Sequence, residues 1–127
     1  MLTLRRFVRL ILLLGLMQTP ALQAFPSQST QAEISHLLDY VAKSGCSFYR
    51  NGIWHDPLAA QQHLSEKYAY FVSGNSIWNS EQFIEKVATQ SSFSGLLYKV
   101  KCVNEVEVPS AQWLLQELVR YRTFSVK

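Results

Sequence analysis

The sequence lacks most of the short motifs that identify an enzyme or a metal site. It has no C-x-x-C pair, no H-E-x-x-H segment and no G-x-S-x-G turn. These absences argue against a thioredoxin-like redox pair, a zinc-protease helix and the nucleophile turn of α/β-hydrolases. Internal repeats and low-complexity tracts are also missing, which argues against solenoid and fibrous architectures.

The first 24 residues have the three parts of a secretory signal peptide. Arginines within the first nine residues give the positive start, and the apolar segment 10–17 follows. A membrane-spanning helix needs about 20 apolar residues, so this segment favours a cleaved leader over an uncleaved anchor. Ala24 ends a Leu-Gln-Ala sequence that fits a signal-peptidase site. We expect residues 25–127 to form one small periplasmic domain without a membrane anchor.

Residues 25–127, the expected mature protein, carry no net charge. The leader holds three of the 12 basic residues and none of the nine acidic ones, so nine of each sign remain. A nucleic-acid-binding domain carries a basic surface, and a polybasic membrane-binding segment does too. The sequence therefore predicts neither a nucleic-acid partner nor a charged membrane contact.

Cysteine is scarce, with only Cys46 and Cys102 present. In an exported chain an even pair predicts a disulfide. A redox-active or metal-binding pair is the alternative, but the spacing matches no zinc site. No metal or other cofactor is expected.

Periodicity predicts an α+β domain of about four helices packed on a small antiparallel sheet. Thr30 opens the first helix, Asp56-Pro57 the second, Asn79 the third and Pro109-Ser110 the fourth. Residues 25–29 are expected to form a short polar segment before the first helix. Gly45 is placed to end the first helix.

The strands are expected on either side of Asn51-Gly52, the strongest hairpin signal in the chain, and over residues 96–103, where apolar and polar residues alternate. Residues 104–108 are expected to form a loop. If Cys46 lies opposite Cys102 in an antiparallel ladder, Phe48 faces Val100 and Arg50 faces Tyr98.

Four blocks of residues carry a resemblance to a known family. They are Gly45-Cys46-Ser47-Phe48-Tyr49-Arg50-Asn51-Gly52, His63-Leu64 with Lys67-Tyr68, Ser91-Ser92-Phe93-Ser94-Gly95 with Tyr98 and Cys102, and Pro109-Ser110 with Trp113-Leu114. In combination they resemble the YfeK-like family of small exported bacterial proteins. The resemblance implies a periplasmic protein of uncharacterised function and brings no catalytic residues with it.

The predicted register gathers polar residues at one end of the ladder, where an arginine, hydroxyls and turn amides could bind an anion. The candidate ligand-binding residues are Arg50, Asn51, His55, His63, Ser91, Ser92, Ser94 and Tyr98. Arg50 falls on the inward face, so an internal partner, either a carboxylate or loop carbonyls, is the preferred interpretation and a ligand the alternative. Serines in turns more often serve the backbone.

The histidines offer a second hypothesis. His63 or His55 with Asp56 and a loop serine could form a nucleophilic site, although no motif supports it. No two histidines have i,i+3 or i,i+4 spacing, which argues against a metal site. His36 lies opposite the apolar stripe of its helix and is expected to be solvent-exposed. The acidic residues are expected on helix surfaces and at caps.

Trp54, Trp78 and Trp113 are expected to cover the edge of the core more than to form an interface. The first functional hypothesis is thus a non-catalytic binding module for an envelope protein, a peptide or a cell-wall fragment. A small periplasmic hydrolase with a His/Ser site is the alternative, so whether the protein is an enzyme stays open.

Overall fold

The protein is an α+β domain with four helices and a four-stranded antiparallel sheet, as the periodicity predicts. The structure is a computed structural model that describes residue 15, residue 17 and residues 25–126. The remainder of the predicted leader lies outside the described residues. The elements in chain order are α1 (Gln28–Lys43), β1 (Ser47–Arg50), β2 (Ile53–His55), α2 (Pro57–Ser73), α3 (Ser80–Val87), β3 (Lys99–Lys101), β4 (Val108–Pro109) and α4 (Ser110–Ser125).

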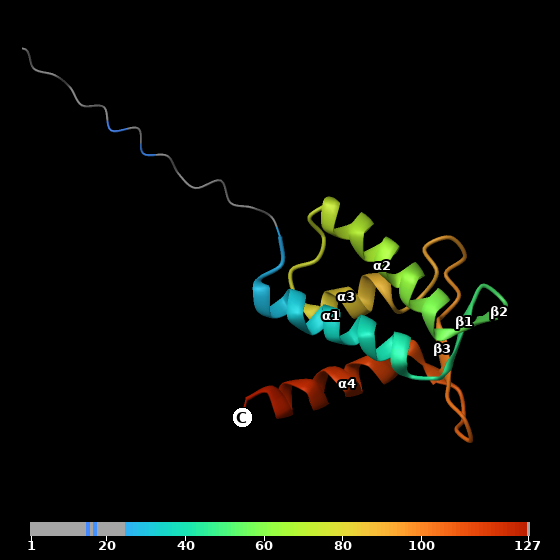
Figure 1. The fold of residues 1–127 in the computed structure, drawn as a ribbon. Helices are drawn as coiled ribbons and strands as arrows, with labels where there is room; N and C mark the ends of the chain where they lie inside the picture. Colours follow the sequence, from blue (N-terminus) through green and yellow to red (C-terminus); the bar gives the residue numbers. More distant parts are fainter. Residues whose placement is uncertain (1–14, 16, 18–24, 127) are drawn as a thin grey trace, which may run out of the picture.

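The helices form one body, with the small sheet at its end (Figure 1). α1 contacts all three other helices, and α3 lies between α2 and α4. A buried core fills the space between them, with Leu37, Phe83 and Val87 fully shielded from solvent. The apolar face predicted for the third helix is confirmed, since Phe83, Ile84, Val87 and Ala88 are all buried.

Side-chain caps explain where three of the helices begin. Asp56 Oδ1 accepts a hydrogen bond from the Ala59 amide at 2.8 Å, with Pro57 at the first helical position. Asn79 Oδ1 accepts from the Gln82 amide at 2.8 Å. Both predicted N-caps are therefore confirmed.

The start of α1 differs from the prediction. Ser27 is the N-cap, and its hydroxyl accepts from the Thr30 amide at 3.2 Å, so the helix begins before Thr30. Residues 28 and 29 are thus helical and do not belong to the polar segment predicted before the first helix. Serine and threonine three residues apart can each cap a helix, and here the earlier residue does so. Gly45, with φ +68°, follows the end of α1 as predicted.

The sheet has the order β2-β1-β3-β4. β1 and β2 form the predicted hairpin through Asn51 and Gly52, whose φ angles of 51° and 84° are those that a tight two-residue turn requires. β1 pairs with β3 so that Phe48 faces Val100. The predicted register is therefore confirmed.

The second half of the sheet is shorter and more divided than expected. Only residues 99–101 of the predicted strand 96–103 form β3, with an isolated bridge between Gln90 and Leu97. Residues 108 and 109, the first of which was expected in a loop, form β4 and pair with β3. The Ser91 amide donates to the Leu96 carbonyl at 2.9 Å, which holds residue 96 in the loop before β3, and Asn104 with φ 59° lies in the turn between β3 and β4. Alternation alone reveals neither feature.

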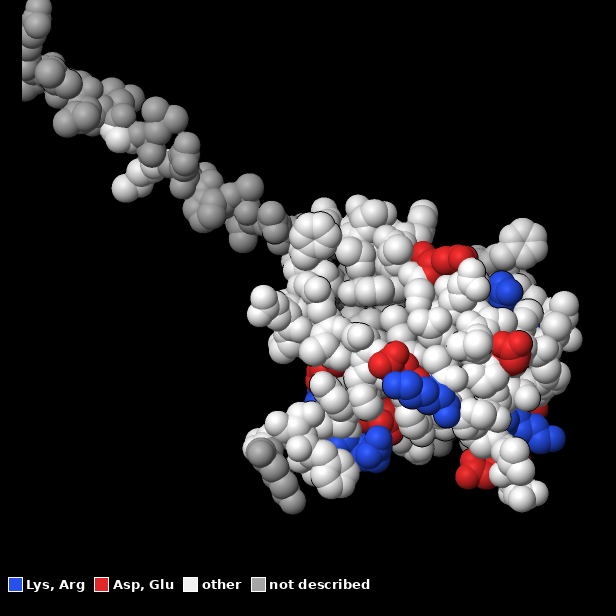
Figure 2. All heavy atoms as spheres, in the orientation of Figure 1, with Lys and Arg blue, Asp and Glu red and all other residues white. Residues whose placement is uncertain are grey.

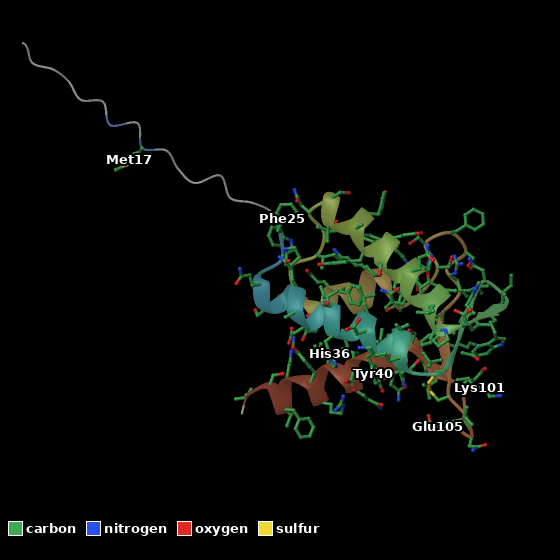
Figure 3. The ribbon with its side chains drawn as sticks, viewed as in Figure 1. Met17, Phe25, His36, Tyr40, Lys101 and Glu105 are labelled. Carbon is green, nitrogen blue, oxygen red and sulfur yellow. A yellow bond between two sulfur atoms is a disulfide. The ribbon has the colours of Figure 1, made fainter. Side chains whose placement is uncertain are left out.

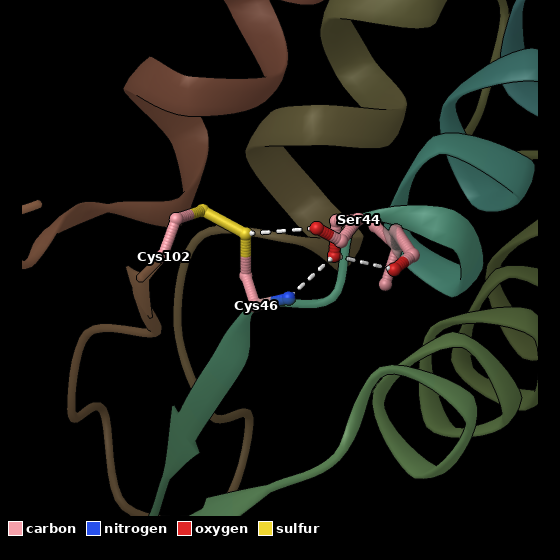
Figure 4. The surroundings of a disulfide bond; sticks show 4 residues. Ser44, Cys46 and Cys102 are labelled. Carbon is pink, nitrogen blue, oxygen red and sulfur yellow. Dashed lines mark hydrogen bonds between the residues drawn. A yellow bond between two sulfur atoms is a disulfide. The ribbon is translucent and has the colours of Figure 1, made fainter. Parts of the chain in front are cut away.

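Cys46 and Cys102 form a disulfide, which connects the end of α1 to the end of β3 (Figure 4). The Cys46 amide donates to Ser44 Oγ at 3.2 Å, and Ser44 Oγ donates to the Val41 carbonyl at 2.8 Å. These bonds fix the chain between the helix and the strand. The predicted disulfide is part of the fold.

The expectation that His36 is exposed is wrong. His36 Nε2 lies 2.7 Å from Glu117 Oε1, and its ring stacks on Tyr121 with centroids 4.1 Å apart. Figure 3 shows His36 and Tyr40 on the side of α1 that faces α4. Glu117 is itself buried, so it is not the surface acid that was expected. α4 packs along this edge of α1, and the stripe of α1 alone does not show that contact.

The three tryptophans do not share one role. Trp113 is partly buried and stacks on Tyr40 at 4.4 Å, so it covers the core edge as predicted. Trp54 and Trp78 are exposed, which corrects the prediction for them. Trp54 contacts Tyr49 on the sheet face that points away from the core.

Charges of both signs are scattered over the face of the molecule in Figure 2, and neither sign forms a large patch there. This view agrees with the balanced charge of residues 25–127. Within residues 25–126, no helix is both long enough and apolar enough to cross a membrane.

Candidate functional site

Two adjoining cavities lie between α2, the β1–β2 hairpin and the loop before β3. Both are lined by Arg50, His63 and Tyr98, so they form a single cleft that we call the Arg50 cleft. The first cavity continues towards Phe48, Tyr49, His55, Ala59, Ala60, Leu64, Lys99 and Ser110. The second opens towards Asn51, Lys67, Tyr70, Phe71, Ser91, Ser92 and Phe93.

The register of the sheet places Arg50 in this cleft. Phe48 and Arg50 are two residues apart on β1, so their side chains leave the same face. Phe48 on that face is buried in the core, whereas Arg50 lies at the end of the strand, next to the turn. The guanidinium therefore reaches the opening of the cleft and is half-buried there.

A chain of hydrogen bonds crosses the cleft from α2. Lys67 Nζ donates to the Tyr98 phenolic oxygen at 3.3 Å and to the Gln90 carbonyl at 2.7 Å. The same phenolic oxygen lies 3.1 Å from His63 Nε2, and the tautomer of the imidazole decides which group donates. The Lys67 ammonium also sits 5.0 Å from the centre of the Tyr98 ring. Tyr98 is therefore held on both sides.

The electrostatics of the cleft keep His63 neutral. Burial lowers the pKa of His63 below its ordinary value of 6.5, and the positive charges of Arg50 and Lys67 lower it further. Burial, followed by the charge of Arg50, also lowers the pKa of Lys67. Burial raises the pKa of Tyr98, so the phenol keeps its proton. These shifts describe a partly desolvated site with excess positive charge.

Arg50 has no carboxylate partner among residues 25–126. No hydrogen bond or ion pair involves its guanidinium there, and no acidic side chain lines either cavity. The preferred interpretation of Arg50 as bonded to an internal partner is therefore wrong for this part of the chain. Guanidinium groups at partly buried positions are normally paired. Among residues 25–126 the Arg50 guanidinium has no such partner, so its hydrogen-bond donors are available to a ligand in the cleft.

The loop serines mainly hold the backbone. Ser91 is buried, and its Oγ accepts from the amides of Phe93 and Ser94, both at 3.2 Å. Ser94 Oγ donates to Asn51 Oδ1 at 2.5 Å, which connects the loop to the hairpin turn. Ser92 is exposed along the second cavity. Ser94 and Asn51 thus shape the opening more than they offer free groups to it.

The His/Ser arrangement of a hydrolase is not assembled in the described structure. His63 bonds to Tyr98, and among residues 25–126 no serine hydroxyl is hydrogen-bonded to His63 or His55. The Asp56 carboxylate caps α2 through Ala59. His55 lines the first cavity opposite Phe48 on the sheet. A nucleophile, base and orienting acid in mutual contact are therefore not found here.

Sequence reasoning missed Lys67, Tyr70, Phe71 and Phe93 as site residues. Lys67 and Tyr70 follow His63 by four and seven residues, so the three lie on one face of α2, and that spacing was the available signal. Phe93 had no such signal, because nothing local shows that the loop 91–96 folds against α2. The side chains of Tyr70 and Phe93 are exposed.

No group of three or more metal-ligating side chains lies together in the part of the chain that the structure describes. The chemistry open to the Arg50 cleft is therefore that of its cations, hydroxyls and aromatic rings.

Comparison with known proteins gives one match. A protein-family model with the description "Family of unknown function (DUF5329)" matches residues 28–122, which include the first three helices, most of α4 and the whole cleft. Neither the curated proteins nor the solved structures contain a match to the chain.

Proposed function

Because the chain belongs to DUF5329, a family of unknown function, we propose its role from the Arg50 cleft: a non-catalytic binding module of the bacterial envelope that recognises an anionic group. The ligand carries this group on an envelope protein, a peptide or a cell-wall fragment.

One observation carries the proposal. Arg50 is half-buried at the junction of two cavities, and no acidic side chain of the described residues pairs with it or lines them. Lys67 adds a second positive charge to the same opening. A desolvated guanidinium gains strongly from a bound anion, since it can donate two parallel hydrogen bonds to a carboxylate or phosphate.

Binding fits the cleft better than catalysis does. His63 and Lys67 are both bonded to Tyr98, and Ser91 is occupied by loop amides. A general base must reach the proton that it removes, and a nucleophile must be activated by such a base. The groups of the cleft are arranged to attract charge, so we favour recognition over the hydrolase alternative.

An envelope location is part of the proposal. It rests on the leader-like sequence of residues 1–24, on the resemblance to the YfeK-like family of exported proteins and on the disulfide. Disulfides persist in oxidising compartments such as the periplasm.

The test compares binding by the wild-type protein and by Arg50 variants. The full chain is expressed with its leader, purified from the envelope fraction and immobilised. A muramidase digest of cell wall and a tryptic digest of envelope proteins are passed over it, and the retained material is quantified by mass spectrometry. We expect retained anionic fragments on the wild type, fewer on Arg50→Lys and none on Arg50→Ala.

Lys101→Ala is the matched control, because it removes an exposed positive charge from β3 outside the cleft. Its retention should equal that of the wild type. Equal retention by Arg50→Ala and the wild type would show that the Arg50 cleft is not the binding site. A shortfall for Lys101→Ala as large as that for Arg50→Ala would indicate nonspecific charge attraction.

A further inference from the structure

We infer that the occupant of the Arg50 cleft is the free carboxylate end of a peptide whose last residue has a small apolar side chain. This inference rests on the proposed function and names the ligand class for the same site. It follows from what lies immediately on either side of Arg50.

The first cavity is apolar and narrow. Its walls away from Arg50 include Phe48, Leu64 and the two small residues Ala59 and Ala60, and its cavity volume is about 30 Å³. Tyr49, His55, Lys99 and Ser110 complete the lining. An anion bound at Arg50 would leave this space unfilled unless an apolar group were attached close to its charge. In a peptide terminus the last side chain leaves the carbon next to the carboxylate, so it can enter the cavity.

The small size of the cavity favours a small side chain. Ala59 and Ala60 stand on successive positions of α2, where larger residues would project into the space. Apolar groups that fill such a cavity gain roughly 0.8 kcal/mol for each methylene removed from water, whereas oversized groups strain their surroundings. Alanine at the peptide terminus meets both conditions.

The second cavity accommodates the residues before the terminus. It is wider, with a volume of about 390 Å³, and it shares Arg50, His63 and Tyr98 with the first cavity. Tyr70 and Phe93 stand at its border with 74% and 97% of their surface exposed. Exposed aromatic rings of this kind gain by packing against a ligand side chain. They provide contacts for an apolar residue two positions before the terminus.

Other anions fit only part of this arrangement. Inorganic phosphate would use the charges of Arg50 and Lys67 but would leave the apolar first cavity empty. An acidic sugar could pack its ring on the aromatic residues, but the walls formed by Phe48, Leu64 and the alanines offer its ring hydroxyls no hydrogen bonds. Beyond the residues shared with the second cavity, only Tyr49, His55, Lys99 and Ser110 could bond to them in the first cavity. A peptide terminus uses both cavities and the cations between them.

Isothermal titration calorimetry on the full-length protein purified from the envelope fraction tests the inference. The probe is acetyl-phenylalanyl-glycyl-alanine, ending in the L or the D form of alanine, which separates a protein terminus from a cell-wall stem peptide. The other ligands are its C-terminal amide, the analogue with terminal phenylalanine, N-acetylmuramic acid and inorganic phosphate. We expect the acid to bind and its amide to bind at least about tenfold more weakly, because the charge-assisted hydrogen bonds are lost.

Two variants test whether the ligand enters the first cavity. Ala60→Leu fills it, and we expect about tenfold weaker binding of the alanine peptide. Because Ala60 packs against the core, replacing it can also disturb the fold. Ala59→Leu at the more exposed neighbouring position is therefore a second variant, and thermal melts check that both variants are folded. A folded protein that binds as tightly after both changes would overturn the inference.

The outcomes separate this inference from the proposed function. Equal binding of the acid and the amide, or tighter binding of terminal phenylalanine than of alanine, overturns the inference. If phosphate or N-acetylmuramic acid binds in an Arg50-dependent way and the peptides do not, the anion-binding module stands and the peptide assignment falls. If Arg50→Ala changes the binding of none of these ligands, the proposed function falls as well.

Discussion

His63 Nε2 on α2 lies 3.1 Å from the phenolic oxygen of Tyr98, 35 residues further along the chain. His63 and Tyr98 both line each of the two cavities, so their contact lies where the cavities of the Arg50 cleft adjoin. Burial lowers the pKa of His63, and the charges of Arg50 and Lys67 lower it further. The charge of Arg50 also opposes the burial that raises the pKa of Tyr98, so Arg50 acts on both rings. The titration of this pair therefore reports on the charge of the cleft.

Replacing Arg50 should raise the pKa of His63 towards its ordinary value. The charge of Arg50 is one of the causes that lower this pKa, and Arg50→Ala removes it. Because Arg50 makes no ion pair with residues 25–126, the free energy of unfolding should change by less than about 1 kcal/mol. NMR titration of the histidine ring protons measures the pKa, and Lys101→Ala should leave it unchanged. An unchanged pKa in Arg50→Ala would show that the guanidinium lies far from the ring.

Stability should fall as the pH drops below about 6.5, through His63. Its pKa is lower in the folded protein than in the unfolded chain, so the unfolded chain binds the proton more readily. The free energy of unfolding should therefore decline between pH 6.5 and the folded-state pKa, and then level off for this residue. Glu33, Glu81 and Glu117, whose folded pKa values are lowered from 4.5, add their own losses at more acidic pH.

His63→Gln isolates this contribution, since glutamine keeps a hydrogen-bonding group near Tyr98 but does not titrate. Chemical denaturation at several pH values should give the variant a flatter dependence than the wild type between the folded-state pKa of His63 and pH 6.5. Identical slopes would mean that His63 titrates as it does in the unfolded chain.

Breaking the disulfide should destabilise the protein by roughly 2–5 kcal/mol. The bridge joins residues 56 positions apart, for which the chain-entropy treatment gives about 4 kcal/mol. Cys46→Ser and Cys102→Ser should cause similar losses, and the double variant should be little worse than either. Thermal melts of the three proteins decide the matter, and additive losses would indicate that each cysteine contributes separately.

The buried carboxylate of Glu117 should matter far more than an exposed one. Burial acts to raise the pKa of Glu117, but hydrogen bonds from Arg120 and His36 outweigh it and hold the pKa below 4.5. Glu117→Gln should cost about 1–3 kcal/mol, because a charged acceptor with two partners is lost from a buried position. Glu107→Gln, which breaks the exposed pair with Lys99, should stay within about 0.5 kcal/mol in the same denaturation experiment.

The protein isolated from the periplasm should begin at Phe25. The mass of the intact chain should correspond to residues 25–127 with one disulfide, because the sequence before Ala24 fits a signal-peptidase site. Mass spectrometry after treatment of the denatured, unreduced protein with a thiol reagent checks both points. Recovery of residues 1–24, or mass added by the reagent, would contradict one or the other.

Local signals in the sequence predict the helices, the hairpin and the register. Asp56 and Asn79 are recognisable caps, and Asn51-Gly52 is a recognisable turn, because each acts on its immediate neighbours. The choice of Ser27 over Thr30 as a cap depends on energies too similar to rank from the sequence. The division of the last strands into β3 and β4 depends on bends in the chain that alternation does not encode.

The cleft could be predicted only in part. Arg50 and Tyr98 follow from the register, which depends on the two cysteines. Lys67 joins them through the packing of α2 on the sheet, and Phe93 through the fold of a loop, both of which are tertiary contacts. Glu117 has a signal in its inward position between Leu114 and Tyr121 on α4. Burial of an acidic residue there is unfavourable without the contacts from His36 and Arg120, which the sequence does not reveal.

Apart from Ser110 at the start of α4, every residue that lines the Arg50 cleft lies between Cys46 and Cys102 in the chain. The binding region is thus a closed covalent ring, with α1 and α4 attached at its junction. A protease that cuts the exposed loop around Phe93 would open the ring without releasing either fragment. The two pieces would stay joined through the sulfurs and packed by the helices, so a nicked protein can keep both walls of the cleft in place until a reductant separates them.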